Sequence, residues 1–133
     1  MNQDVVNTKH YTQRSFQPRE AMQFMNSYIG SAFKYVFRHK DKGGKTDLDK
    51  AVQFLQFQLD DTPSFQAMSY ADFDKCCKKI NDDTTLTDDE KAILCGLVFI
   101  TYERHTGKGN SGRAALLRAI KMINAMKIKV YAA

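Results

Sequence analysis

Apolar residues along this chain recur mainly at the three- and four-residue spacing of amphipathic helices. The clearest pair of such segments lies between positions 28 and 59. The first segment has apolar residues at Ile29, Ala32, Phe33, Val36 and Phe37, and the second has them at Leu48, Ala51, Val52, Leu55 and Leu59. This periodicity predicts two helices that each bury one face. The stretch between them, HKDKGGK, is basic and glycine-containing, so we expect a loop that contributes nothing to the core.

Other helix starts are marked by capping residues. Pro18 suits a first helical turn because its missing N–H costs no hydrogen bond there. Thr46 or Asp47 can cap the second helix of the pair, and Ser69 can cap a helix that ends near position 80. This last helix should turn Tyr70, Phe73, Cys76, Cys77 and Ile80 inward.

Thr87 and Glu90 match the capping-box pattern, a hydroxyl followed three residues later by a glutamate. The segment 91–105 that follows is apolar nearly all round, which predicts the central buried helix. A last helix is expected at 113–126, and the β-prone tail IKVYAA is left unassigned or as an edge extension.

These elements predict an all-α fold, a compact bundle of five or six helices that includes a basic helix–glycine loop–helix hairpin. The 133 residues fit a single domain. Its parts are an irregular arm at 1–16, the hairpin region at 17–59 and further helices at 64–133.

Charge is unevenly distributed along the chain, which has a formal net charge of +5. Residues 1–59 carry nine Lys or Arg against five Asp or Glu, residues 60–90 carry three against nine, and residues 91–133 carry eight against one. This basic, acidic, basic order fits an anionic ligand, self-association of opposite patches or weak nucleic-acid affinity. It also fits ordinary solvated helix faces.

The cysteines and histidines do not indicate a disulfide framework or a metal site. Three cysteines, two of them adjacent, form no CxxC motif, and the histidines at 10, 39 and 105 lack metal-ligand spacing. We therefore expect no metal site. The N-terminal stretch is polar and no long apolar run is present, so we expect a cytoplasmic protein that does not enter membranes.

Two basic glycine loops, 39–45 and 106–113, each open onto a predicted helix. A helix N-terminus offers unpaired N–H groups and partial positive charge, which suit a phosphate. The first loop would add Lys40, Lys42 and Lys45, and the second Lys108 and Arg113. Neither loop has the order of a Walker A motif. Each could equally be a plain solvated connector.

A sharper constellation lies on the hairpin helices. Lys34 and Arg38 are four residues apart and project together, and Asp47 and Lys50 can face the same groove. A single carboxylate among cations could orient a lysine, bind Mg²⁺ through a phosphate or position a nucleophile. The alternative is that Asp47 only caps its helix.

Two other kinds of site find no support in the residue spacing. No Ser–His–Asp or Cys–His assembly is indicated. Nucleic-acid binding is not expected, because the aromatic residues near the basic positions are interpreted as mostly core-facing: Phe33, Tyr35, Phe37, Phe54 and Phe57.

The first half of the chain resembles a known family. The resemblance is carried by His10-Tyr11, by the run from Gly30 to Gly44 (GSAFKYVFRHKDKGG) and by Asp47 to Leu55 (DLDKAVQFL). These segments are similar to a small phage-borne domain family that was long without a known function. The family includes the nucleotide kinase of T-odd coliphages, which phosphorylates deoxynucleoside monophosphates without a Walker motif.

The resemblance covers about residues 9–59 and implies a phage protein with a nucleotide ligand. The implied catalytic residues are Lys34, Arg38 and Asp47. The implied nucleotide-binding residues are His10, Tyr11, Gly30, Lys42 and Lys50, to which the second loop adds Lys108 and Arg113. Two positions depart from the family pattern: Ser31 replaces an asparagine and Phe54 replaces a tyrosine.

We therefore expect a nucleotide kinase that uses Mg²⁺ with ATP or another nucleotide and forms a homo-oligomer in the host cytoplasm. His10 and Tyr11 would close over the base. One alternative is a non-enzymatic phage protein that sequesters a nucleotide signal of host defence. Another is an inhibitor that acts on a host enzyme by protein interaction.

Overall fold

The computed structural model describes residues 16–131, and His10 and Tyr11 lie outside this range. Its six helices are α2 (Arg19–Met22), α3 (Ser27–Arg38), α4 (Lys45–Asp61), α5 (Tyr70–Asp82), α6 (Asp88–Tyr102) and α7 (Asn110–Tyr131), and no strand occurs within 16–131. The predicted all-α bundle is therefore confirmed. No helix in this part of the chain has the length and apolar character needed to cross a membrane.

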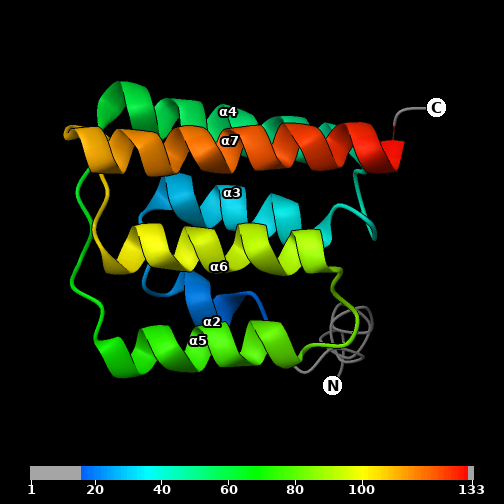
Figure 1. Ribbon diagram of the computed structural model, residues 1–133, viewed down its shortest axis with the longest axis horizontal. Coiled ribbons are helices and arrows are strands. Elements are labelled where there is room, and N and C mark those ends of the chain that lie inside the picture. The colour runs from blue at the N-terminus through cyan, green and yellow to red at the C-terminus, as the bar shows by residue number, and fades with distance from the viewer. Residues whose placement is uncertain (1–15, 132–133) are drawn as a thin grey trace, which may run out of the picture.

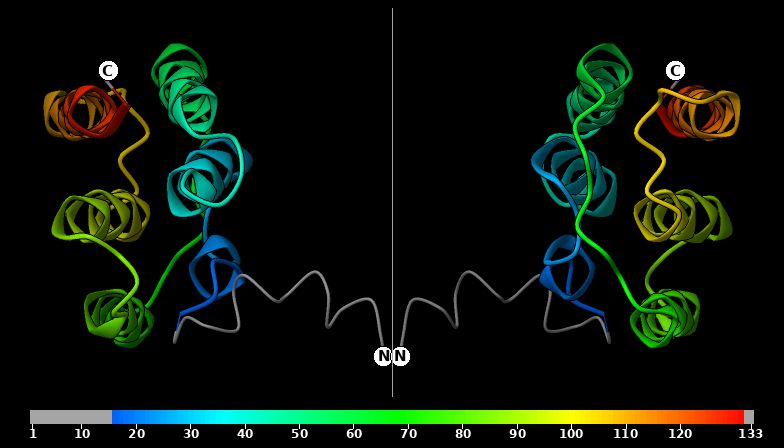
Figure 2. Two further views of the ribbon diagram at one scale, coloured as in Figure 1. Left: turned by 90° about the vertical axis from the view of Figure 1, so that its right-hand side faces the viewer. Right: turned by 90° about the vertical axis from the view of Figure 1, so that its left-hand side faces the viewer.

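The helices form two layers of three (Figures 1 and 2). One layer holds α2, α3 and α4, and the other holds α5, α6 and α7. The α3–α4 hairpin has the most extensive packing, and the layers meet where α3 contacts α6 and α4 contacts α7. The loop after α3 and the end of α7 lie at the same end of the bundle (Figure 1).

Capping residues set several of the helix starts. Asn26 accepts from the N–H of Ile29 at the start of α3, and Ser69 caps α5 as predicted. Thr87 and Glu90 form the predicted capping box of α6, with both hydrogen bonds present. The neutral or acidic side chains at these positions satisfy helix N–H groups that would otherwise lack a partner.

The core is continuous through both layers. Phe33 and Phe37 of α3 are fully buried, and the ring of Phe16 packs edge-on against both, with each pair of centroids 6.0 Å apart. The N–H of Phe16 donates to the buried carboxylate of Asp83 over 3.2 Å. The end of the predicted irregular arm is thus part of the core.

Two sequence expectations on the C-terminal half were wrong. The last helix runs from Asn110 to Tyr131, so half of the second glycine loop and most of the β-prone tail are helical. Tyr70, expected to point inward, is 63% exposed. It joins Phe73, Phe99 and Tyr102 in a cluster of ring contacts between α5 and α6.

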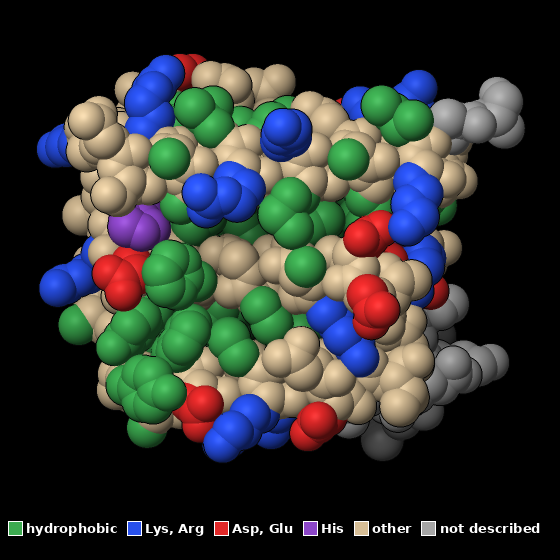
Figure 3. Space-filling model, in the orientation of Figure 1, with side chains coloured by type: hydrophobic (Ala, Val, Ile, Leu, Met, Phe, Trp, Pro, Cys, Tyr) green, Lys and Arg blue, Asp and Glu red, His purple; other side chains and the backbone are tan. Residues whose placement is uncertain are grey.

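This α5–α6 aromatic cluster lies on the outer face of its layer. Figure 3 shows apolar side chains gathered over α5 and α6, toward the end where α5 begins and α6 ends. Lys and Arg side chains follow α7 along the edge of the same face. The helix predicted as central, α6, is therefore buried on the side of α3 and open on this one, where Phe99 is 43% exposed.

Candidate functional site

The loop between α3 and α4 is built around the carboxylate of Asp47. Asp47 is 1% exposed, and its Oδ2 accepts from the N–H of Gly43 over 2.9 Å. A Cβ at Gly43 would fall on this carboxylate, and Gly44 has a φ of +58°, which favours glycine. The two glycines therefore serve the loop geometry, which brings the chain close to Asp47.

Arg38 is the second partner of Asp47. Its Nε donates to Oδ2 over 3.1 Å, and a terminal nitrogen donates to Oδ1 over 3.3 Å. Such two-pronged pairing fixes both side chains. Asp47 thus links the end of α3, the loop and the first turn of α4. It does not cap its helix in the usual way, because the N-cap residue is Gly44.

Three cations surround the ring of Tyr35. Lys34 Nζ and Arg38 Cζ each lie 4.7 Å from the ring centroid, and Lys50 Nζ lies 5.4 Å from it. Cations at these distances are attracted by the π-face of the ring. Lys34 and Lys50 have no carboxylate within ion-pair distance among residues 16–131. We call Lys34, Arg38 and Lys50 the Tyr35 cation cluster.

The Tyr35 ring also begins a row of aromatic side chains along the outside of the α3–α4 seam. Tyr35 stacks with Phe54, Phe54 contacts Phe57, and Phe57 contacts Tyr28, with centroids 5.5–5.9 Å apart. We call these four residues the outer aromatic row. Phe33 and Phe37 are core residues as expected, and Tyr35 and Phe54 are partly buried against the core. The interpretation of Phe57 as core-facing was wrong, because this residue is 36% exposed.

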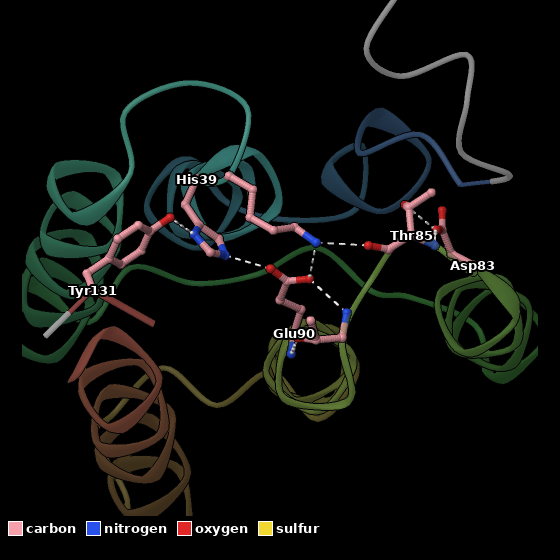
Figure 4. A network of polar contacts seen from close by, with 7 residues as sticks. His39, Asp83, Thr85, Glu90 and Tyr131 are labelled. Atoms are coloured by element: carbon pink, nitrogen blue, oxygen red, sulfur yellow. Dashed lines mark hydrogen bonds and ion pairs between the residues drawn. The ribbon is translucent and has the colours of Figure 1, made fainter. Parts of the chain in front are cut away.

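Behind the loop lies a polar network that the sequence did not reveal. His39 is 1% exposed; its Nδ1 is 2.6 Å from the Tyr131 hydroxyl, and its Nε2 is 2.6 Å from Glu90 Oε2 (Figure 4). The loop was expected to contribute nothing to the core. His39 corrects this, because its partners come from α6 and α7.

Glu90 is the anionic centre of this network. Burial opposes its charge, but hydrogen bonds from His39, the Thr87 N–H and Lys40 outweigh burial and lower the pKa of Glu90 to about 2. Glu90 is therefore ionised at neutral pH and can only accept, so Nε2 of His39 carries a proton. Lys40 also donates to the carbonyl of Thr85 over 2.9 Å.

The order Tyr131–His39–Glu90 follows the pattern of a catalytic triad, but the hydroxyl is not activated. Burial and the charges of Glu90 and Asp47 raise the pKa of Tyr131 above its ordinary value. The hydroxyl therefore keeps its proton, and its bond partner is a buried ring. We assign the three residues the role of fastening α7 and α6 to the end of α3.

The remaining predicted site residues do not gather at one place. Lys42 is exposed on the first loop. It precedes Gly43, whose N–H donates to the Asp47 carboxylate. The loop that contains Lys108 and the first turn of α7, which contains Arg113, lie at the opposite end of the bundle, near the end of α4 (Figure 1). The 17 residues of α4 separate the two ends, about 25 Å at the helical rise. The two basic loops therefore cannot share one small ligand.

Gly30 lies one helical turn before Lys34 on α3. It is buried, and the atoms nearest to a Cβ there would belong to Met25 and Met22, at 3.7 and 4.0 Å. Gly30 thus serves packing between α3 and the preceding turn. Lys45 is exposed in the first turn of α4.

The part of the chain that the structure describes holds no group of three or more His, Cys, Asp or Glu side chains placed to bind a metal. Its cysteines are all free. Burial raises the pKa of the Cys76 thiol to about 11, so this thiol stays protonated at neutral pH.

No family model, no curated protein and no solved structure matches this chain. The resemblance to the phage-borne family therefore rests on the residues that carry it.

Proposed function

We propose that the chain binds a (deoxy)nucleotide through its phosphates at the Tyr35 cation cluster. The observation that carries this proposal is the gathering of Lys34, Arg38 and Lys50 within 5.4 Å of one ring centroid. Asp47 neutralises part of this charge through Arg38, and the two lysines stay without a carboxylate among residues 16–131. A polyphosphate is the ligand class that such a cluster suits best.

The resemblance to the phage-borne family supports the same ligand class, because its motif falls on these residues. Lys34 and Arg38 come from the GxxxKYxxR run, and Lys50 from the DLxKA run. The fold brings both runs onto one side of the α3–α4 seam. Lys42 is an exposed cation on the adjoining loop, where its N–H donates to the carbonyl of Arg38 over 3.0 Å.

The activity that we propose is phosphoryl transfer from ATP to a deoxynucleoside monophosphate, in the host cytoplasm. Lys34, Arg38 and Lys42 would neutralise charge on the transferring group. Magnesium would enter with the nucleotide as part of the substrate. Asp47 would position Arg38, since Arg38 and Gly43 already bond its oxygens.

Binding is tested by calorimetry with tripolyphosphate and with each dNTP, on the wild type, Lys34→Gln and Lys50→Gln. We expect each variant to lose about ten- to a hundredfold in affinity, as one charge-assisted contact is worth about 1.5–3 kcal/mol. Lys78→Gln is the matched control, because Lys78 lies on α5 and pairs with Asp74. Equal affinity in all four proteins would remove the proposed site.

Turnover is tested separately by supplying ATP, Mg²⁺ and each dNMP and measuring dNDP. Product formation that Lys34→Gln abolishes would support the kinase. A nucleotide that binds tightly and is released unchanged would favour the sequestering alternative. No binding of any nucleotide would favour the inhibitor of a host enzyme.

A second proposal concerns self-association through the α5–α6 aromatic cluster. Tyr70 is 63% exposed and Phe99 is 43% exposed on one face, and contiguous apolar surface of this kind marks interaction sites. We expect light scattering to report a homo-oligomer that Tyr70→Ser combined with Phe99→Ser dissociates. A monomeric wild type would contradict this proposal.

A further inference from the structure

The outer aromatic row has charges of opposite sign at its two ends. At one end, Tyr35 lies under Lys34, Arg38 and Lys50. At the other end, the Tyr28 hydroxyl donates to Asp61 Oδ2 over 2.6 Å. Between these ends, Phe57 is 36% exposed and lies 5.5 Å from Tyr28 and 5.7 Å from Phe54.

The row is not needed to fill the seam beneath it. Phe33, Val36 and Phe37 on α3 and Leu48, Ala51 and Leu55 on α4 are already fully buried there. The row forms a second layer outside them, and it leaves part of the Phe57 ring open to solvent. Nucleobases stack on exposed aromatic faces that lie near cations, and here the nearby Lys34 and Lys50 have no carboxylate within ion-pair distance among residues 16–131.

We propose that the outer aromatic row is the base-binding platform, with the base stacked on Phe57 beside Tyr28 and the phosphates at the Tyr35 cation cluster. This inference rests on the proposed function, because the phosphate anchor fixes which end of the row the base occupies. Tyr28 and Lys34 are six residues apart on α3, about 9 Å along the helix. A single nucleotide spans this separation between its base and its outer phosphates.

The opposite charges at the two ends of the outer aromatic row determine the orientation in which a nucleotide binds and the kind of nucleic-acid ligand that fits. Asp61 places negative charge next to Tyr28, so phosphates are repelled from that end. An oligonucleotide would have to carry its next phosphate past this carboxylate, which favours a mononucleotide.

The test compares a ligand with a base and a ligand without one. Calorimetry with dATP and with tripolyphosphate is performed on the wild type and on Phe57→Leu, which keeps apolar bulk but removes the ring. Phe24→Leu is the matched control, because Phe24 is a partly buried ring that lies among side chains of α2 and α5, outside the row. Stacking is followed independently through the fluorescence of 2-aminopurine deoxynucleoside triphosphate, which stacking on an aromatic ring quenches.

We expect dATP to bind the wild type at least tenfold tighter than tripolyphosphate, in line with the stacking of one base. Phe57→Leu should lose this preference and most of the quenching, and it should keep the tripolyphosphate affinity. A preference for dATP that Phe57→Leu retains would place the base elsewhere and overturn the platform alone. Failure of both ligands to bind would overturn the proposed function itself.

Two further measurements test whether something other than a mononucleotide binds to the outer aromatic row. A (dT)₁₀ oligonucleotide that binds tighter than dTTP would overturn the mononucleotide in favour of single-stranded nucleic acid. A change of oligomeric state in Phe57→Leu, detected by light scattering, would assign the row to a second copy. Unchanged size and weaker oligonucleotide binding support the platform.

Discussion

The hydroxyl of Tyr131 lies 2.6 Å from Nδ1 of His39, although 92 positions separate the two residues in the chain. Through this contact the last turn of α7 is fastened to the start of the loop that follows Arg38 and whose Gly43 N–H donates to Asp47. The geometry of the candidate site therefore depends on the C-terminal helix, which holds none of the cations around Tyr35.

Tyr131→Phe tests this contact. The variant keeps the ring that packs edge-on against His39, but it removes the partner of a buried imidazole nitrogen. Leaving such a group unsatisfied costs about 1–3 kcal/mol, and we expect urea unfolding to report a loss of that size. Tyr102→Phe is the control, because that hydroxyl makes no hydrogen bond with residues 16–131. Equal losses in the two variants would contradict the fastening role.

The lowered pKa of Glu90 predicts that the free energy of unfolding depends on pH. Its pKa falls from an ordinary 4.5 to about 2 on folding, so the ionised form favours the folded state. This contribution is fully present above pH 4.5 and is lost as the pH falls toward 2, and it amounts to on the order of 3 kcal/mol.

The readout is the difference in unfolding free energy between the wild type and Glu90→Gln, measured from pH 7 to pH 2. Other carboxylates titrate in the same range, and taking the difference removes their effect. We expect the difference to be largest above pH 4.5 and to shrink toward pH 2. A difference that is constant across this range would show that the charge of Glu90 does not stabilise the fold.

Gly43 and Gly96 predict opposite responses to alanine. A Cβ at Gly43 would collide with the Asp47 carboxylate, whereas a Cβ at Gly96 would meet no atom within 4 Å. We expect Gly43→Ala to destabilise the protein by about 1–3 kcal/mol. Gly96→Ala, inside α6, should stabilise it by about 0.5–1 kcal/mol. Thermal unfolding measures whether each variant melts at a lower or a higher temperature than the wild type. A similar change in both variants would contradict the close approach of Gly43 to Asp47.

Local signals in the sequence were sufficient for much of the fold. Thr87 with Glu90 and Ser69 act within one helical turn, so their caps are encoded by neighbours in the chain. The apolar spacing of α3 and α4 likewise identified their buried faces. Lys34, Arg38 and Lys50 were grouped correctly: helical spacing puts Lys34 and Arg38 on one face of α3, and the short connection makes α4, which carries Lys50, pack beside it.

The features that could not be predicted from the sequence depend on contacts between residues far apart in the chain. His39 looked like a loop residue, since its partners lie 51 and 92 positions away. The tail containing Ile128 and Val130 looked β-prone, and packing of α7 overrides that preference. Phe57 looked buried because its ring is apolar, whereas the seam beneath it is already filled. The signal that could have found it is the spacing of Lys50, Phe54, Phe57 and Asp61 on one face of α4.

Asp47→Asn separates a positioning role from direct participation in binding. The substitution weakens the two-pronged bond with Arg38 and leaves an acceptor for the Gly43 N–H, so we expect a stability loss of about 1–3 kcal/mol. Because the Arg38 guanidinium is then less neutralised, tripolyphosphate should bind as tightly as in the wild type or tighter. Asp49→Asn is the matched control: it removes one charge from the same helix, at an exposed residue that pairs with Lys127. If Asp47 instead held magnesium or oriented a phosphate, Mg²⁺–dATP affinity would fall in Asp47→Asn and not in Asp49→Asn, which would contradict the positioning role.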